Sequence, residues 1–147
     1  MVVMSRTGSP SIDESTASGA HAAERLRSSR VIWMTTVSGH GVPQSSPVWY
    51  LWDGGDFTIY SRKSPRHDNV TQNPAVGLHL DGNGLGGDIV IVEGLARVDN
   101  SLPPVPDNEA YLAKYGEIMA QRGWTPQWFW DNYPIPLSIT PTRFRSW

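Results

Sequence analysis

The stretch RVIWMTTVSGHGVPQSSPVWYLWDGGDFTIYS, residues 30–61, predicts the centre of the fold. Three β-branched and aromatic runs cover 30–37, 42–52 and 57–61, and the turns SGHG and DGGD separate them. Such runs are typical of strands, so the stretch predicts a three-stranded antiparallel meander. Pro43 and Pro47 cannot donate to a β-ladder, so the middle segment is expected at a sheet edge or a bulge.

On the N-terminal side, residues 1–18 are rich in Ser, Thr and Gly, which predicts a mobile tail. The segment SGAHAAERLRSSR that follows predicts a short amphipathic helix, with Ala22, Ala23 and Leu26 forming its apolar stripe. At this length the remaining residues, 19–147, are expected to form one domain.

On the C-terminal side, five further elements are expected: a helix over 64–72, strands over 75–80 and 88–98, a helix over 108–123, and a last strand over 136–147. Asp107 is the expected cap of the longer helix and Gly123 its stop, and Pro141 is expected to interrupt the last strand. Six strands with short turns predict a mainly β, α+β fold, namely a small six-stranded antiparallel barrel with peripheral helices.

Composition excludes several classes of protein. The 12 basic and 14 acidic residues give a net charge of −2, which argues against nucleic-acid or membrane-surface binding by charge alone. The chain has no cysteine, so disulfides and thiolate chemistry are excluded, and its four histidines show no metal-ligand spacing. No apolar run reaches the ~20 residues of a membrane span, and the N-terminus lacks the apolar region of a signal peptide. A cytoplasmic protein without a metal site is therefore expected.

Two motifs favour ordinary structural interpretations. GNGLGG at 82–87 matches G-x-G-x-x-G, but it lies between two expected strands and opens no helix, so a hairpin loop is favoured over a dinucleotide site. Ser45 and Ser46 lie outside any G-x-S-x-G context, which gives hydrolase chemistry little support.

A basic cluster in SRKSPRHDNV, residues 61–70, indicates a binding site. Arg62, Lys63 and Arg66 fall where a helix begins, at the positive end of its dipole. A solvated surface is one interpretation, but free N–H groups and the hydroxyls of Ser61 and Ser64 would suit a phosphate.

The edge segment QSSPVW precedes this cluster and offers backbone and side-chain groups of the kind that hold a planar ring by its edge. Phosphate and ring together indicate a nucleotide-like or flavin-like cofactor.

The order of these segments, from TTVSG at 35 through NPAVGLHL ending at 80 to VIVEGLARV at 90–98, resembles the pyridoxamine-phosphate-oxidase-like split β-barrel superfamily. It is more similar to the actinobacterial branch that uses the deazaflavin coenzyme F420. The resemblance covers 22–98 well and 137–147 more loosely. It implies a flavin-binding split barrel, and a homodimer whose two cofactor sites are shared between subunits. It also implies an oxidoreductase that transfers a hydride between F420 and an unsaturated organic acceptor.

The resemblance also assigns binding residues. SPVWYL at 46–51 corresponds to the segment beside the ring, Arg62 and Lys63 to the basic pair that holds the phosphate, and Tyr60 and Ser61 to contacts with the phosphate and ribityl chain. The candidate cofactor-binding residues are Gln44, Ser45, Ser46, Pro47, Val48, Trp49, Tyr60, Ser61, Arg62, Lys63, Arg66 and Asn69. No catalytic residue is assigned, because the cofactor carries the hydride chemistry.

Departures from the family pattern bear on the choice of cofactor. The vitamin-processing oxidases carry Arg and Lys where this chain has Ser46 and Leu51, which disfavours their activity and favours F420 over FMN. An FMN-dependent oxidase or reductase of the same fold and a non-enzymatic flavin-binding or deazaflavin-binding protein remain alternatives. The aromatic stretch WTPQWFWDNY, 124–133, is expected either to wall the acceptor pocket or to pack against the preceding helix.

Overall fold

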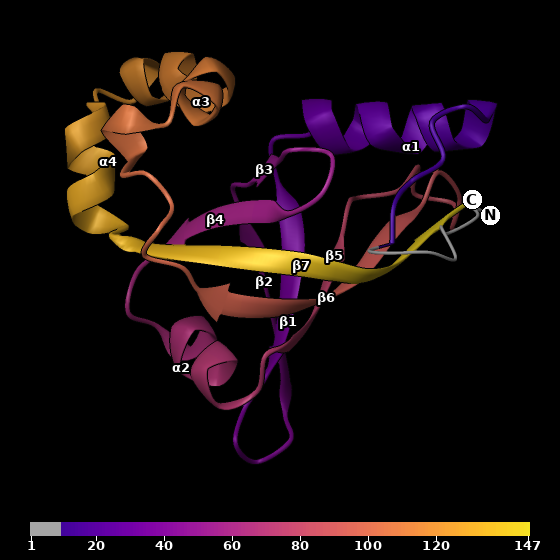
Figure 1. The fold of residues 1–147 in the computed structure, drawn as a ribbon, viewed down its shortest axis with the longest axis horizontal. Coiled ribbons are helices and arrows are strands. Elements are labelled where there is room, and N and C mark those ends of the chain that lie inside the picture. The colour runs from indigo at the N-terminus through magenta and orange to yellow at the C-terminus, as the bar shows by residue number, and fades with distance from the viewer. Residues whose placement is uncertain (1–9) are drawn as a thin grey trace.

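The computed structural model describes residues 10–147, which form a curled antiparallel half-barrel of the α+β class (Figure 1). The strands are β1 (Ile32–Val37), β2 (Pro43–Val48), β3 (Leu51–Trp52), β4 (Phe57–Ser61), β5 (Ala75–His79), β6 (Val90–Val98) and β7 (Ile135–Ser146). Their order in the sheet is β2-β1-β5-β6-β7-β4-β3, so β2 and β3 are the two edges. The edge position predicted for the proline-containing segment is confirmed.

Four α-helices lie around the sheet; the positions of the three predicted ones are correct to within a few residues, and the last one, in the aromatic stretch, was not predicted. They are α1 (Ala17–Ser28), α2 (Pro65–Gln72), α3 (Glu109–Gln121) and α4 (Pro126–Asn132), with a 3-10 turn η1 (Val105–Asp107) before α3. Figure 1 shows α1 above the sheet and α2 below it, with α3 and α4 at the end away from the C-terminus. No helix in the described part of the chain is long and apolar enough to cross a membrane.

The sheet has seven strands rather than the six predicted, because the expected strand over 42–52 is split. The break falls at Trp49 and Tyr50, whose position between β2 and β3 is fixed by α3. The Tyr115 hydroxyl accepts from the Tyr50 N–H at 2.8 Å, and Lys114 Nζ donates to the Tyr50 carbonyl at 2.9 Å. Side chains of a distant helix therefore replace a neighbouring strand as hydrogen-bond partners of Tyr50, and sequence periodicity carries no sign of this.

The last strand is continuous, which corrects the expectation that Pro141 would interrupt it. β7 runs through Pro141, and the ladder with β6 shifts register there: Glu93 pairs with Arg143 and Gly94 with Pro141. A bulge accommodates a residue that cannot donate to a ladder. Gly94 permits the close approach, since a Cβ on it would lie 2.8 Å from Ile139 Cγ2.

Two apolar clusters stabilise the molecule. The larger one fills the concave side of the sheet with mostly aliphatic side chains and includes the predicted stripe of α1, Ala22, Ala23 and Leu26. The second lies where α3 and α4 cover β4 and the β2–β3 break, and its buried members are mostly aromatic. This aromatic cluster lies next to the candidate site described below.

Two expectations about helix starts need correction. Within the predicted tail, the described residues 10–18 are not free of the domain: Ile12 is buried in the larger cluster, and Thr16 caps α1 by accepting from the Gly19 N–H. Residues 1–9 lie outside the described residues. The cap of α3 is Asn108 rather than Asp107, because Asp107 belongs to η1 and the Asn108 side chain accepts from the Tyr111 N–H.

Candidate functional site

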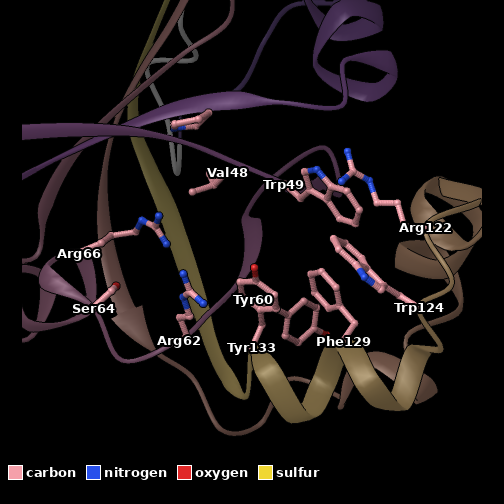
Figure 2. A pocket seen from close by; sticks show the side chains of 11 residues that line it. Val48, Trp49, Tyr60, Arg62, Ser64, Arg66, Arg122, Trp124, Phe129 and Tyr133 are labelled. Carbon is pink, nitrogen blue, oxygen red and sulfur yellow. The ribbon is translucent and has the colours of Figure 1, made fainter. Parts of the chain in front are cut away.

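A cavity of about 360 Å³ opens between the start of α2 and the α3–α4 corner (Figure 2). Five aromatic side chains form most of its walls: Trp49, Tyr60, Trp124, Phe129 and Tyr133. Three arginines line it as well: Arg62, Arg66 and Arg122. Its remaining lining residues are Pro47, Val48 and Ser64, so no carboxylate faces the cavity from the described residues. The cavity is thus aromatic and positively charged within an acidic chain.

A second, more polar cavity of about 300 Å³ adjoins the first along β2. Hydroxyl and amide side chains of β1 and β2 line it: Thr36, Gln44, Ser45 and Ser46. Ser64 and Arg66 line both cavities, so the two spaces meet at the start of α2. Together they fall within the volume range of small-molecule sites.

The start of α2 follows directly from local sequence. Ser64 is the N-cap, with its hydroxyl 3.5 Å from the His67 N–H, and Pro65 occupies the first turn, where a missing N–H costs nothing. The chain therefore leaves β4 and enters α2 within three residues, and Arg62 and Arg66 come to the same side.

Arg66 is the best fixed of the cations. Its Nη2 donates to Ser46 Oγ at 3.0 Å and its Nη1 to Ser61 Oγ at 3.1 Å, so the guanidinium bridges β2 and β4. Burial, and secondarily the charge of Arg62, lowers the pKa of Arg66. The group stays charged at neutral pH, but it is partly desolvated and has only neutral partners. Such a cation favours an anionic ligand, because a negative charge would offset its desolvation.

Asn69 lies one turn further along α2 and organises the polar cavity from beneath. Its Nδ2 donates to Thr36 Oγ1 at 2.9 Å and to Gln44 Oε1 at 2.7 Å. The side chain of Asn69 is buried, so it holds Gln44 in place rather than lining the cavity itself.

Ring stacking forms the opposite wall. Trp49 lies between Tyr115 and Phe129, with centroid distances of 4.5 Å and 5.4 Å and nearly parallel planes. Tyr133 stacks on Phe129 at 4.6 Å, and the Arg62 guanidinium lies 5.6 Å from the centre of the Tyr133 ring. These rings come from three separate segments of the chain.

The structure places the predicted residues in three groups. Eight line one of the two cavities: Gln44, Ser45, Ser46, Pro47, Val48, Trp49, Tyr60 and Arg62; Arg66 lines both. Ser61 and Asn69 are buried behind the surface and hold other side chains. Lys63 is exposed and lines neither cavity.

Tyr60 borders the cavity through its ring rather than through a free hydroxyl. That hydroxyl donates to the Pro103 carbonyl at 2.6 Å and accepts from Asn108 Nδ2 at 3.0 Å, and burial raises its pKa. The proton of this hydroxyl is therefore already donated within the protein, and the phosphate contact that the resemblance implies stays a prediction.

Several lining residues were not among the predicted site residues. Thr36 and Arg122 had no signal in the sequence, since each reaches a cavity only through tertiary packing. Trp124, Phe129 and Tyr133 belong to the aromatic stretch for which two roles were expected. The expected packing against α3 is confirmed, and the same rings line the cavity, whose use by an acceptor stays a prediction.

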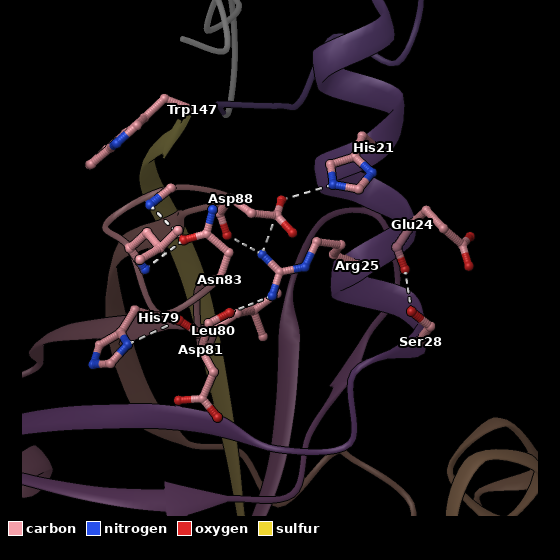
Figure 3. Close-up of polar contacts among 12 residues, drawn as sticks. His21, Glu24, Arg25, Ser28, His79, Leu80, Asp81, Asn83, Asp88 and Trp147 are labelled. Carbon is pink, nitrogen blue, oxygen red and sulfur yellow. Dashed lines mark hydrogen bonds and ion pairs between the residues drawn. The ribbon is translucent and has the colours of Figure 1, made fainter.

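The other end of the molecule holds a polar network of a different kind (Figure 3). Arg25 on α1 donates to the backbone carbonyls of Asp81 and Asp88, and His21 Nε2 lies 2.8 Å from the Asp88 carboxylate. These contacts fasten α1 to the predicted glycine-rich loop, which joins β5 to β6 and opens no helix. Within residues 10–147, no group of three potential ligands is arranged to hold a metal ion.

Comparison with known proteins identifies a family. The family model described as "Pyridoxamine 5'-phosphate oxidase" matches residues 19–147. The search of curated proteins gave no match.

Solved structures share the fold at low sequence identity. An F420 reductase is 22% identical with a TM-score of 0.58, and the alignment covers 83% of this chain and 94% of that one. A FAD-binding protein from Mesorhizobium loti is 16% identical with a TM-score of 0.61, covering 86% and 90%. The heme storage protein HutZ from Vibrio cholerae is 13% identical with a TM-score of 0.58, covering 84% and 91%. At these identities the likeness shows the fold alone, which hosts several ligands.

Proposed function

The chain belongs to the pyridoxamine 5'-phosphate oxidase family, and on this premise we propose that it is an oxidoreductase that binds coenzyme F420 and exchanges a hydride with an unsaturated organic acceptor. One observation carries the proposal: Arg66, which bridges Ser46 and Ser61, lines an aromatic cavity that contains three arginines and no carboxylate from the described residues. The F420 reductase among the structural neighbours supports the choice of coenzyme.

The residues present fit a phosphate-bearing planar ring. Arg62, Arg66 and the hydroxyl of Ser64 offer charge-assisted and neutral donors to a phosphate at the start of α2. The edge strand β2 presents Ser45, Ser46 and an unpaired backbone edge to a ring lying along it. The aromatic cavity next to it has room for an acceptor.

When bound, the deazaflavin supplies the hydride donor or acceptor. The protein residues position and enclose the reactants. Arg66 anchors the anionic end, β2 fixes the ring edge, and the rings of Trp49 and Phe129 exclude water from the neighbouring space. The hydride transfer itself needs no acid–base pair of the chain, and a separate proton transfer completes the reduction of the acceptor.

The preference for F420 over FMN rests on the departures at β2 and β3. Ser46 stands where the vitamin-processing oxidases carry an arginine. The Arg66 side chain on α2 nevertheless places a guanidinium at this position, because it donates to the Ser46 hydroxyl. Leu51 stands where those oxidases carry a lysine. It packs against the aromatic cluster, so β3 supplies no cation in place of that lysine. The two cavity arginines at the start of α2, Arg62 and Arg66, suit a coenzyme with several negative charges. We further propose that the protein acts in the cytoplasm as a homodimer with shared sites, and light scattering would test the oligomeric state.

Competitive titration tests the proposal directly. Quenching of Trp49 and Trp124 should report tighter binding of F420 than of FMN, and the reduced coenzyme should be oxidised when a suitable acceptor is supplied. Tighter FMN binding would favour a flavin-dependent oxidase or reductase. Tight F420 binding without turnover in a broad acceptor screen would favour a binding protein, a role consistent with the heme storage protein among the neighbours.

A further inference from the structure

Arg122 is the cavity arginine that the proposed coenzyme site does not use. Figure 2 shows Arg62 and Arg66 on one side of the cavity and Arg122 with Trp124 on the other. The phosphate donors all belong to the first side. The second side has a cation and a flat ring of its own.

The α3–α4 corner holds these two side chains in place. Gly123 adopts a left-handed conformation with φ of 73°, its N–H donates to the Ala120 carbonyl, and the Trp124 N–H donates to Met119 at 2.8 Å. These two hydrogen bonds form the Schellman motif, which ends the helix. It reverses the chain within one residue, so Arg122 and Trp124 lie together, with the guanidinium 5.2 Å from the Trp124 ring centre. Trp124 is itself stacked on Trp128 at 4.8 Å.

The usual structural role of a basic residue at a helix end does not account for Arg122. Backbone N–H groups of the Schellman turn already bond the last carbonyls of α3, so a side-chain cap is not needed. Within residues 10–147, Arg122 makes no ion pair, and the cavity lining offers no carboxylate to it. Its guanidinium instead faces space bounded by an aromatic ring.

We propose that Arg122 and Trp124 form a subsite for a planar carboxylic acid, so that the acceptor of this enzyme is a conjugated acid with its carboxylate on Arg122 and its ring against Trp124. A planar guanidinium pairs with a carboxylate through two parallel hydrogen bonds, and stacking on Trp124 pre-orients it. The identification of the bound acid as the acceptor rests on the proposed function, but binding of an acid at this subsite does not require the coenzyme.

The test therefore uses binding to the protein without coenzyme. Calorimetry compares 2-naphthoate with 2-naphthamide, which has the same ring and no charge. We expect the wild-type protein to bind the acid about three- to tenfold more tightly, a modest ratio because Arg122 is exposed. Arg122→Gln should abolish this preference, while Arg143→Gln, the same change of charge on an exposed arginine outside both cavities, should retain it. Equal binding of acid and amide by the wild type, or an undiminished preference in Arg122→Gln, would overturn the proposal.

A second measurement separates this subsite from the coenzyme site. F420 affinity should be unchanged in Arg122→Gln; a clear loss would assign Arg122 to the coenzyme and overturn the acceptor role. If the wild type binds neither F420 nor FMN yet prefers the acid through Arg122, the proposed function fails while the acid subsite stands.

Discussion

The two walls of the aromatic cavity are built by different physical means. On the α2 side, hydrogen bonds fix Arg66 to Ser46 and Ser61, and its partners are neutral. On the α3–α4 side, stacked rings fix Trp49 between Tyr115 and Phe129. The first wall places a partly desolvated charge beside a cavity, which disfavours folding and favours a ligand. The second wall buries apolar area, which favours folding. Mutations on the α2 side should therefore mainly change ligand affinity, and mutations on the α3–α4 side should mainly change the free energy of unfolding.

The largest effect is expected from Trp49→Ala on the stacked wall. Removing the ring leaves a gap between Tyr115 and Phe129, and we expect the free energy of unfolding to fall by about 3 kcal/mol. Urea denaturation measures this change. The matched control is Trp147→Ala, which removes a ring that is 56% exposed and should cost less than about 1 kcal/mol. Equal losses in the two variants would show that the stack contributes no special stability.

Arg66→Met should separate binding from stability. Coenzyme affinity should fall by about 10- to 100-fold, corresponding to ~1.5–3 kcal/mol for a lost charge-assisted contact. The unfolding free energy should stay constant or rise by up to about 1 kcal/mol, because burial already lowers the pKa of Arg66 and no carboxylate pairs with it. Fluorescence titration and urea denaturation on the same sample check both. A large stability loss with unchanged affinity would make Arg66 purely structural.

Lys114, behind the stacked wall, predicts a pH dependence of stability. Burial lowers its pKa to about 8, although its Nζ lies 3.7 Å from the Tyr50 ring centre and donates to the Tyr50 carbonyl. The unfolded chain, with the ordinary higher pKa, binds the proton more tightly. The stability of wild type relative to Lys114→Met should therefore rise as pH increases from about 8 to about 10.5, by about 1 kcal/mol after allowance for partial exposure. Urea midpoints of both proteins at several pH values test the sign, and a fall over that range would contradict it.

The smallest effect is expected at Lys63. The family resemblance assigns it to the phosphate, but its side chain is exposed and lines neither cavity. Screening limits such a charge, so Lys63→Ala should weaken coenzyme binding by no more than about 0.5 kcal/mol. The comparison with Arg66→Met in one titration series decides which cation holds the anion. A tenfold loss in Lys63→Ala would mean that the bound protein brings Lys63 inward.

The α2 side of the cavity could be predicted from the sequence, whereas much of the α3–α4 side could not. The α2 wall is encoded locally: Ser64 and Pro65 announce a helix start, and Arg66 follows one residue later. The meander and the edge position of β2 could also be predicted, because turn residues and prolines constrain only the backbone close to them in sequence. These features were predicted correctly from short-range rules.

The features that were missed depend on partners far along the chain. The β2–β3 break is made by Lys114 and Tyr115 about 65 residues away, and no local rule encodes it. Arg122 reaches the cavity because the α3–α4 corner packs against Trp49 in the β2–β3 break, and the Tyr60 hydroxyl bonds Pro103 and Asn108. The predicted interruption at Pro141 was wrong, because a bulge opposite Gly94 accommodates the proline without ending the strand.

The two prolines of β2 also bear on strand pairing between molecules. An open sheet offers its outermost strands as templates on which other chains can pair. Here one edge, β3, is only two residues long, and the other carries Pro43 and Pro47. Neither edge can take a long additional strand, so the free polar backbone of β2 stays available to a small molecule instead of a neighbouring chain.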